Sequence, residues 1–396
     1  MKVVHLNTFD TGGAATACDR LHNGLTNKGV ESNVLVLHKT QDRIKYHSFL
    51  TQSFPFTTRI RNSLKARWLR AKRNRILSKV KTCERLSLPF SPYSVERHPL
   101  IQASDIIHLH WISDFLDYPT FFKKIDKPVV WTLHDTNPFG GLFHYPLDLE
   151  YNKHLKPQDN YVFSRKRNIL NQAKNLHFIS LCRWMQQKLM DSRISVRSEL
   201  VPNGINTQLY APIDKSSARQ YFNIPHDKKV ILFVAENVEN HRKGFHLLEQ
   251  IMRSLSDPSI LLCTLGNSKR NIAETMSLGF LTQEETLVKA YSAADVFVIP
   301  SLEDNLPNTA IEAMSCAVPV VGFNVGGLPD IIDDGINGEL ATAYDILDFA
   351  RKVTRILEDQ GYRHRLSINA REKVKTAFEL NSVVNAHLEI YKQISA

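Results

Sequence analysis

Long apolar runs are missing from this sequence of 396 residues. No stretch of about 18 or more apolar residues occurs, although a helix that crosses a bilayer needs about 20. The first residues, Met1–Leu6, are typical of a strand, and the glycines that follow do not form the apolar core of a signal peptide. We therefore expect no membrane-spanning helix and a cytoplasmic location.

Cysteine is scarce, and its five residues form no Cys-x-x-Cys pair. A zinc site or a disulfide framework needs clustered or paired thiols, so neither is indicated. Scattered thiols fit buried, reduced side chains of a cytosolic protein. No cluster of metal-ligating residues is visible, and we expect no metal and no other cofactor. The cysteines are Cys18, Cys83, Cys182, Cys263 and Cys316.

Acidic residues are nearly absent from one segment, residues 59–85, which holds eleven Lys or Arg residues and a single acid, Glu84. Removing these from the totals of 50 bases and 40 acids leaves 39 of each, so the net charge of +10 comes from this segment alone. A general basicity that would favour nucleic acid is therefore absent.

The basic segment 59–85 is expected to form a helix with one apolar stripe. Such a helix is typical of a membrane interface, where the stripe enters the headgroups and the cations meet anionic lipid. Two other interpretations stay open: a helix packed on the first domain, and a nucleic-acid contact, although only one aromatic residue lies in the segment. We expect docking on an anionic membrane surface and no nucleic-acid partner. The stripe comprises Ile60, Leu64, Trp68 and Ala71, extended by Leu77 and Val80.

The chain is long enough for two domains, and strands alternate with helices in two successive series. The turn Pro202-Asn203-Gly204-Ile205-Asn206 separates them, which places a first domain at 1–206 and a second at 207–378. Two such series predict an α/β protein with two doubly wound, Rossmann-like domains that face a cleft between them. The expected strands are 2–6, 31–37, 106–110, 129–133, 177–180, 199–201, 230–235, 260–265, 296–299 and 318–322. The expected helices are 14–27, 163–172, 183–190, one from 244, 284–292, one ending at 314, 346–357, 362–378 and 381–394.

The stretch Ser301–Met314, SLEDNLPNTAIEAM, combines a polar loop after a strand with the start of a helix. Asp304 in the loop and Glu312 on the helix can present two carboxylates to one ligand, and carboxylates accept hydrogen bonds from hydroxyls. The backbone N–H groups near Asn305, Leu306 and Thr309 form a helix N-terminus suited to phosphate. Hydroxyls together with phosphates suggest a nucleotide sugar.

This stretch resembles the glutamate, any seven, glutamate signature of the retaining GT-B glycosyltransferases of family 4. In that family the first acid binds the donor sugar and the second the nucleotide ribose, which would assign these roles to Asp304 and Glu312. Glu303 stands one residue before the register, so whether Glu303 or Asp304 contacts the sugar is open. The family also implies that the last helix, residues 379–396, returns to the first domain.

Further segments carry the resemblance from the first strand to about Gly338. Gly12-Gly13 opens the first helix where family members approach the donor with glycines, although a plain tight turn explains the pair as well. His134, at a strand tip, matches a histidine that contacts the donor sugar in a subset of the family; a structural histidine is the alternative. Leu278-Gly279-Phe280-Leu281 resembles the segment that flanks the nucleotide base.

Arg242-Lys243 lies between a strand and a helix of the second series, where two cations can stabilise a leaving diphosphate. A solvated basic pair is the simpler interpretation. Many family members place a further arginine just after the strand, where this chain has Glu236 and Asn237.

The resemblance implies a retaining hexosyltransferase that moves a sugar from a nucleotide diphosphate sugar to a glycan acceptor. Together with the basic segment 59–85 it leads us to expect a polyprenyl-linked acceptor of cell-surface polysaccharide biosynthesis, at the inner face of the membrane. A nucleotide-sugar epimerase of the same fold and a non-catalytic, membrane-associated partner are the two alternatives. The base, the sugar, the acceptor and the oligomeric state do not follow from the sequence.

Overall fold

The computed structural model describes residues 1–43, 45–52, 56–267 and 275–395, with side chains in α2 described from Ile60 onward. The chain divides into two compact units. Unit 1 comprises Met1–Pro202 together with Val383–Ala396, and unit 2 comprises Asn203–Ser382. The boundaries expected from the turn at 202–206 and from the last helix lie within a few residues of these.

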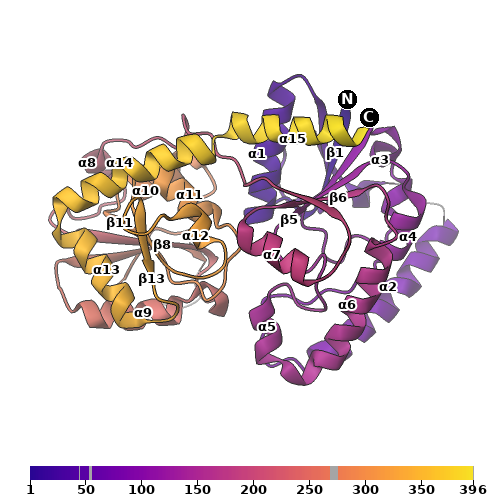
Figure 1. The fold of residues 1–396 in the computed structure, drawn as a ribbon, viewed down its shortest axis with the longest axis horizontal. Coiled ribbons are helices and arrows are strands. Elements are labelled where there is room, and N and C mark those ends of the chain that lie inside the picture. The colour runs from indigo at the N-terminus through magenta and orange to yellow at the C-terminus, as the bar shows by residue number, and fades with distance from the viewer. Residues whose placement is uncertain (44, 53–55, 268–274, 396) are drawn as a thin grey trace. The chain divides into compact units, whose positions relative to one another are not determined.

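Unit 1 is built on a parallel sheet whose seven described strands run in the order β3-β2-β1-β4-β5-β6-β7, with helices on both faces (Figure 1). Its strands are β1 (Lys2–Phe9), β2 (Glu31–His38), β3 (Tyr46–Ser48), β4 (Ile106–Leu109), β5 (Val129–Leu133), β6 (Leu176–Ser180) and β7 (Arg197–Leu200). Its helices are α1 (Gly13–Asn27), α2 (Phe56–Leu77), α3 (Pro99–Ala103), α4 (Tyr118–Lys124), α5 (Pro146–Tyr151), α6 (Lys156–Leu170) and α7 (Arg183–Asp191), with 3-10 turns at Phe49–Thr51, Val95–Arg97 and Lys153–Leu155.

Unit 2 repeats the same winding, with the described strands in the order β10-β9-β8-β11-β12-β13, all parallel. Its strands are β8 (Lys229–Asn237), β9 (Ile260–Asn267), β10 (Thr275–Ser277), β11 (Val296–Ile299), β12 (Val320–Phe323) and β13 (Gly338–Ala341). Its helices are α8 (Lys215–Tyr221), the 3-10 turn η4 (His241–Lys243), α9 (Phe245–Leu255), α10 (Glu284–Ser292), α11 (Asn308–Ser315), α12 (Leu328–Ile331), α13 (Ile346–Glu358) and α14 (Gln360–Ala377).

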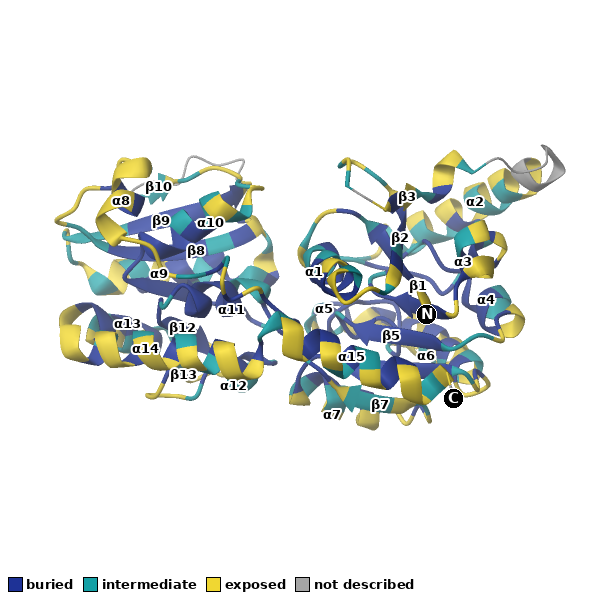
Figure 2. Cartoon of the chain, turned by 90° about the horizontal axis from the view of Figure 1, so that it is seen from above, coloured by how far each residue is buried: buried dark blue, intermediate teal, exposed yellow. Residues whose placement is uncertain are grey.

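The expected pair of doubly wound parallel sheets is therefore confirmed. Helices cover both faces of these sheets, so the strands are near-continuous buried apolar runs, which is the pattern that made them recognisable (Figure 2). Three short strands, β3, β10 and β13, were not expected because none of them forms an apolar run of useful length.

Several expected boundaries differ by a few residues, and two of these differences have a local reason. The helix expected at 163–172 is α6, Lys156–Leu170, which begins earlier because Pro157 suits the first turn of a helix. The strand expected from Val318 begins at Val320, since Pro319 has no N–H to donate to a neighbouring strand.

The last helix, α15 (Leu380–Ser395), joins unit 1 from Val383 onward. It buries Val384, Ile390 and Tyr391 there, and the Tyr391 hydroxyl lies 2.6 Å from Nδ1 of His108 on β4. This agrees with the return of the last helix that the family resemblance implies.

Candidate functional site

The polar residues of unit 2 gather where its strand order reverses. β8 and β11 are neighbours, and the chain winds away from them in opposite directions. In open α/β sheets, ligands bind beyond the carboxyl ends of the strands at such a reversal. The loops that leave β8 and β11 are the ones that carry Arg242, Lys243, Glu303 and Asp304.

A tight turn brings the two cations of the first loop to the second. The Asn240 side chain accepts a hydrogen bond from the Arg242 amide at 3.0 Å and thereby starts η4. Gly244 follows with a φ of 72°, and a Cβ there would collide with the carbonyl oxygen of Pro300 at the end of β11. Only glycine lets the turn approach this closely.

The Asp304 carboxylate forms ion pairs with both cations of this turn. Its Oδ2 lies 2.7 Å from Lys243 Nζ, its Oδ1 lies 3.3 Å from the Arg242 guanidinium, and the Ser301 hydroxyl donates to Oδ2 at 3.2 Å. Burial alone would raise the pKa of Asp304, but Lys243 and Arg242 outweigh it and hold the pKa below its ordinary value. Asp304 is thus a buried carboxylate whose oxygens are already occupied, unlike the open sugar ligand that the family signature suggests.

A third loop closes on the same residue. The Gly327 amide donates to the Asp304 carbonyl at 3.0 Å, and a Cβ on Gly326, whose φ is 57°, would strike that carbonyl. The glycines after β12 therefore hold the Asp304 backbone in place.

Glu303 is less buried than Asp304. Within residues 301–307 it is half-buried, whereas the other six, including Asn305 and Leu306, are buried. The Arg242 guanidinium donates to the Glu303 carbonyl at 2.8 Å, which fixes the backbone beneath this side chain. Of the two acids left open by the sequence, Glu303 is the more accessible.

Glu312 lies on α11 and is 6% exposed. One of its oxygens accepts a hydrogen bond from the Tyr291 hydroxyl at 2.7 Å, so its carboxylate is held against α10. The helix itself begins at Asn308 without a side-chain cap. Phosphate binding at its first amides stays a prediction from the sequence.

The segment expected to flank a base lies in the loop after β10. Gly279 has a φ of 79°, and its carbonyl accepts from the Gly266 amide at 2.8 Å. Phe280 is 52% exposed. An exposed aromatic ring offers a face on which a base can stack.

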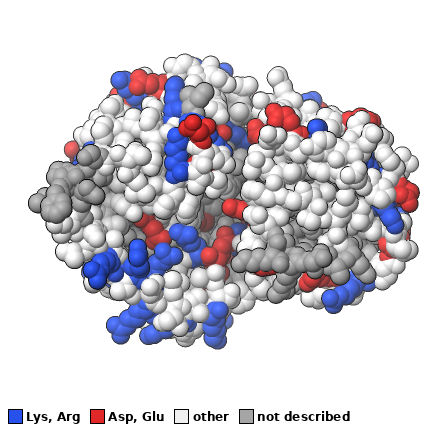
Figure 3. Space-filling view, turned by 180° about the vertical axis from the view of Figure 1, so that it is seen from behind, with Lys and Arg blue, Asp and Glu red and all other residues white. Residues whose placement is uncertain are grey.

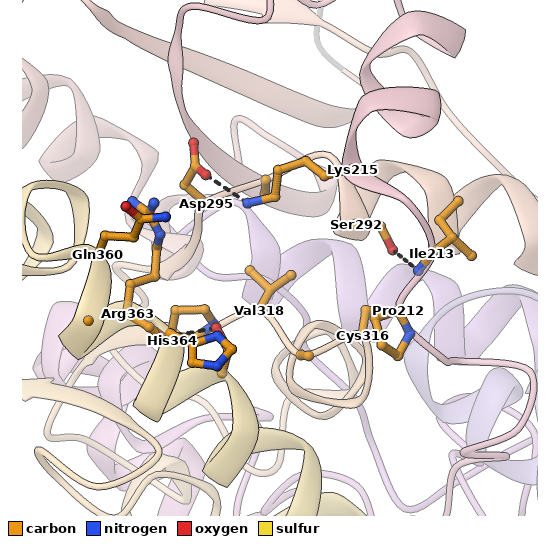
Figure 4. A pocket seen from close by; sticks show the side chains of 15 residues that line it. Pro212, Ile213, Lys215, Ser292, Asp295, Cys316, Val318, Gln360, Arg363 and His364 are labelled. Atoms are coloured by element: carbon orange, nitrogen blue, oxygen red, sulfur yellow. Dashed lines mark hydrogen bonds and ion pairs between the residues drawn. The ribbon is translucent and has the colours of Figure 1, made fainter.

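A cavity of unit 2 lies away from these residues, at the amino ends of β11 and β12 (Figure 4). Its volume is about 710 Å³, and Lys215 is paired with Asp295 at its wall, with Arg363 and His364 on another side. None of the residues expected to bind the donor lines this cavity. This cavity is therefore separate from the candidate site.

In unit 1, Gly12 and Gly13 lie directly after β1, at the corresponding reversal of strand order. Gly12 has a φ of 90° and forms the N-cap of α1, with its carbonyl accepting from the Thr16 amide at 2.9 Å. The preceding Asp10 is buried and accepts from the Thr40 and Gln41 amides at 2.6 and 2.7 Å. Asp10 thus anchors the glycine turn to the loop after β2.

His134 is half-buried at the end of β5 and contacts a second histidine. Its Nε2 lies 3.1 Å from Nδ1 of His110, and the Nε2 of His110 lies 3.0 Å from Nδ1 of His5. Burial lowers the pKa of His134 to about 4 and the pKa of His110 well below its ordinary value. These imidazoles are neutral at pH 7.

The loop after His134 is fixed by a buried network around Asp135. Asp135 accepts from the Trp111 indole at 2.7 Å and contacts His144 Nδ1 at 2.5 Å, while His144 Nε2 lies 2.6 Å from the Ser87 hydroxyl. The same contacts activate the nucleophile of serine hydrolases. Ser87 is only 1% exposed, so no substrate reaches its oxygen, and the network serves to hold the loop.

Lys166 on α6 holds the other side of this loop. Its ammonium group donates to the carbonyls of Asn137 and Gly141 at 2.5 and 2.8 Å, and Asp159 accepts from the Leu142 amide at 2.6 Å. Burial lowers the pKa of Lys166 to about 7, against the opposing attraction of Asp135 and Asp159. Sequence reasoning missed Lys166 because nothing in its neighbourhood along the chain distinguishes it from a surface lysine.

The basic segment forms α2, but its expected stripe is divided. Ile60, Leu64 and Trp68 are 46%, 61% and 58% exposed, whereas Leu77 and Val80 pack against the apolar cluster that includes Leu142. Leu77 follows Ile60 by 17 residues, about 4.7 turns of helix, so the two lie on different faces. Including Leu77 and Val80 in the outward stripe was therefore wrong.

The cations of α2 are divided in the same way. Lys65 pairs with Asp117 at 2.8 Å and Arg73 with Asp114 at 3.0 Å, which tie the helix to unit 1. Arg61, Arg67 and Arg70 are exposed. Figure 3 shows Lys and Arg side chains gathered along the lower left of unit 1, where α2 runs.

Two family models match the chain on either side of the unit boundary. Residues 11–209 match glycosyltransferase family 4, and residues 214–373 match glycosyl transferases group 1. The chain belongs to glycosyltransferase family 4.

Curated relatives align with parts of this family member. The D-inositol 3-phosphate glycosyltransferase of Streptosporangium roseum is 31% identical over 195 residues, which cover 44% of this chain and 45% of that enzyme. An uncharacterised glycosyltransferase of Methanocaldococcus jannaschii is 24% identical over 315 residues, covering 74% and 76%. The chain thus spans less than half the length of the first of these relatives.

Solved structures share its fold over the whole length. Sucrose-phosphate synthase from Thermosynechococcus elongatus superimposes with a TM-score of 0.73 at 18% identity, covering 100% of this chain and 99% of that one. Anabaena HepE, solved with UDP and glucose, gives 0.73 at 17% identity, covering 99% and 100%. The GT-B fold expected from the sequence is confirmed.

The low pKa of Lys166 predicts a pH-dependent contribution to stability. Between pH 7 and 10 the unfolded state binds a proton at this residue that the folded state lacks, so the free energy of unfolding rises with pH by up to about 1.4 kcal/mol per unit. Replacing Lys166 by Met removes this term. Denaturant unfolding at pH 7, 8, 9 and 10 should show the wild-type protein gaining stability relative to Lys166→Met.

The exposed Lys156, also on α6, provides the control, because Lys156→Met should leave the difference from wild type constant with pH. A constant difference for Lys166→Met as well would mean that Lys166 keeps its proton in the folded protein.

Proposed function

We propose that this protein transfers a hexose from a nucleotide diphosphate sugar to a hydroxyl of a glycan or lipid-linked glycan, with retention at the anomeric carbon. The observation that carries the proposal is the convergence of Arg242, Lys243, Glu303 and Asp304 at the strand-order reversal of unit 2, in a member of glycosyltransferase family 4. Anabaena HepE, which shares the fold, was solved with UDP-glucose, and this supports a UDP-sugar as the first donor to test.

The geometry suggests different roles for the neighbouring acids Asp304 and Glu303. Asp304 holds Lys243 and Arg242 in position, so that two cations are ready for the diphosphate as negative charge develops on it. Glu303 is the more accessible acid and would accept hydrogen bonds from sugar hydroxyls. Glu312, fixed by Tyr291, would do the same for the ribose. Because Arg242 and Lys243 supply the positive charge, the proposed reaction uses no metal.

Gly13 and His134 would serve the sugar and acceptor side from unit 1. In the proposed front-face reaction the leaving phosphate accepts the proton of the attacking hydroxyl, while an oxocarbenium-like sugar is held by fixed hydrogen bonds. Such a reaction depends on positioning and charge stabilisation rather than on a protein nucleophile.

A donor panel tests the activity. Purified protein incubated with UDP-, GDP- and ADP-sugars and a mixture of glycan acceptors should release one nucleoside diphosphate and bind it without acceptor. Failure to bind or turn over any donor would reject the proposal. Conversion of the donor sugar in the absence of acceptor, seen by NMR, would indicate an epimerase, and binding without any product would indicate a non-catalytic partner.

Substitutions distinguish the proposed roles of Glu303 and Asp304. Glu303→Gln should lower kcat/KM for the nucleotide sugar by about 10- to 100-fold, the value of one or two hydrogen bonds to a charged group, and leave the affinity for the free nucleotide unchanged. Asp304→Asn should instead lower the free energy of unfolding by about 3–5 kcal/mol, because it leaves Lys243 and Arg242 without their buried partner. Full activity of Glu303→Gln, with a stable but inactive Asp304→Asn, would reverse the assignment.

A peripheral membrane role is the second part of the proposal. No helix within the described ranges combines the length and apolar character of a membrane span. The exposed Ile60, Leu64 and Trp68 on α2, beside exposed arginines, fit an anionic bilayer surface. The role would bring the enzyme to a lipid-linked acceptor of polysaccharide synthesis. WaaG, a glycosyltransferase involved in lipopolysaccharide biosynthesis, shares the fold at a TM-score of 0.68.

Vesicle flotation tests the α2 surface. Replacing Arg61, Arg67 and Arg70 by Gln should weaken binding to vesicles containing anionic lipid by on the order of 100-fold, at about 1 kcal/mol for each cation removed. These residues are chosen because Lys65 and Arg73 form ion pairs within unit 1.

The matched control removes three exposed cations elsewhere, Lys123, Lys174 and Arg253, by the same substitution. Equal flotation of both triple variants and the wild type would argue against docking through α2.

A further inference from the structure

Three histidines from neighbouring strands form a continuous chain behind the glycine turn of unit 1. His5 lies on β1, His110 directly after β4 and His134 directly after β5, and these strands are adjacent in the sheet. The two contacts between them measure 3.0 and 3.1 Å. His5 is fully buried and His110 is 3% exposed. The sheet therefore sets the spacing of all three rings.

The backbone holds the middle ring firmly. The His110 amide donates to the Leu6 carbonyl at 2.9 Å, and the Trp131 indole donates to the His110 carbonyl at 3.0 Å. His108 stacks on the His110 ring with centroids 4.3 Å apart and is itself fixed between Tyr391 and Thr132. His110 thus has little freedom to rotate away from its two partners.

A neutral imidazole has one N–H and one bare nitrogen, which restricts the chain to two proton arrangements. If His110 donates from Nδ1 to His134, its Nε2 accepts from His5, and both end rings carry their proton on Nδ1. If His110 donates from Nε2 to His5, both end rings carry their proton on Nε2. The tautomer of His134 is therefore coupled to that of His5, two rings away.

The His5 end of the histidine chain distinguishes the two proton arrangements. Nε2 of His5 is buried and has no hydrogen-bond partner among the described residues. In the first arrangement this atom is a bare nitrogen, and in the second it is an N–H without an acceptor. Buried N–H groups without an acceptor are the rarer case in proteins, so the first arrangement is favoured.

We propose that His110 and His5 are positioning residues that place the single proton of His134 on Nδ1, so that His134 acts as a neutral hydrogen-bond donor. The inference rests on the proposed function, in which His134 contacts the donor sugar. A neutral donor of fixed orientation suits a sugar hydroxyl or a developing negative charge, because it needs no reorientation during the reaction. It also keeps His134 from competing with the leaving phosphate for the acceptor proton.

The tautomer is read directly by long-range proton–nitrogen NMR on protein labelled with [¹⁵N]histidine, with the His134 signals identified by their loss in His134→Asn. In the wild type, Nδ1 of His134 should show the shift of a protonated nitrogen and Nε2 that of a bare one. His110→Leu should remove this preference, and His110→Gln, which can still donate to His134 and accept from His5, should retain it.

Activity provides the second readout. His110→Leu should lower kcat by about 10-fold, the value of one hydrogen bond, with the affinity for the free nucleotide unchanged, and His110→Gln should recover most of the loss. His177 on β6 is a buried histidine that is not part of the histidine chain. His177→Leu should therefore change neither the His134 tautomer nor kcat. Circular dichroism identifies any variant that fails to fold, in which case the comparison rests on His110→Gln and His5→Gln.

Three results would overturn the proposal: a proton on Nε2 of His134 in the wild type, an unchanged tautomer in His110→Leu, or one bound zinc per chain that is lost in Cys18→Ala. Cys18 places its sulfur within 4.8 Å of donor atoms of His5 and His110, and a metal on these nitrogens would displace the shared hydrogen. The NMR readout needs no turnover. An inactive wild type with the stated tautomer would therefore reject the proposed function alone, and an active wild type with a different tautomer would reject the histidine chain alone.

Discussion

The Asp304 carboxylate is the contact on which the polar end of unit 2 depends. Three loops from three adjacent strands meet at this residue. The loop after β11 carries Asp304, the loop after β8 contacts its carboxylate through Lys243 and Arg242, and the loop after β12 contacts its backbone carbonyl through the Gly327 amide. The buried Arg242 and the partly buried Lys243 would be costly without a counter-charge. The acid therefore gives the three loops a common partner, and the approach is close enough that Gly244 and Gly326 are required beside it.

The strand ends of unit 1 are held mainly by uncharged side chains. Its strand ends carry imidazoles that burial keeps neutral, joined to one another and to hydroxyls. Buried acids also lie at these strand ends: Asp10 accepts from the Thr40 and Gln41 amides, and the charged Asp135 is surrounded by the Trp111 indole, His144 and the Asn137 amide. Neutral donors fix orientation at a lower desolvation cost than ions. The two units thus bring different chemistry to equivalent positions of the same winding, with a cluster of ion pairs in unit 2 and a network built mainly on neutral imidazoles in unit 1.

Most of the architecture was predictable from the sequence, because buried parallel strands are short apolar runs and the punctuating glycines stand between them. The stretch Ser301–Met314 also predicted which loop carries the acids. It did not predict that Asp304 would be taken by Arg242 and Lys243, since those residues lie about sixty positions away and meet only when β8 and β11 pair. Lys166 and the His5–His110 contact were missed for the same reason: each depends on neighbours in space that lie far apart along the chain.

The return of α15 makes unit 1 discontinuous along the chain, whereas unit 2 is one uninterrupted segment. This asymmetry matters for dissecting the protein. Unit 2 can be cut out between Asn203 and Ser382 without severing any of its own strands. A fragment that ends at Pro202 would lack the side chains of α15, and His108 would lose the Tyr391 hydroxyl in the middle of a buried sheet. Unit 1 is therefore best produced as a fusion in which residues 383–396 follow Pro202 through a short linker.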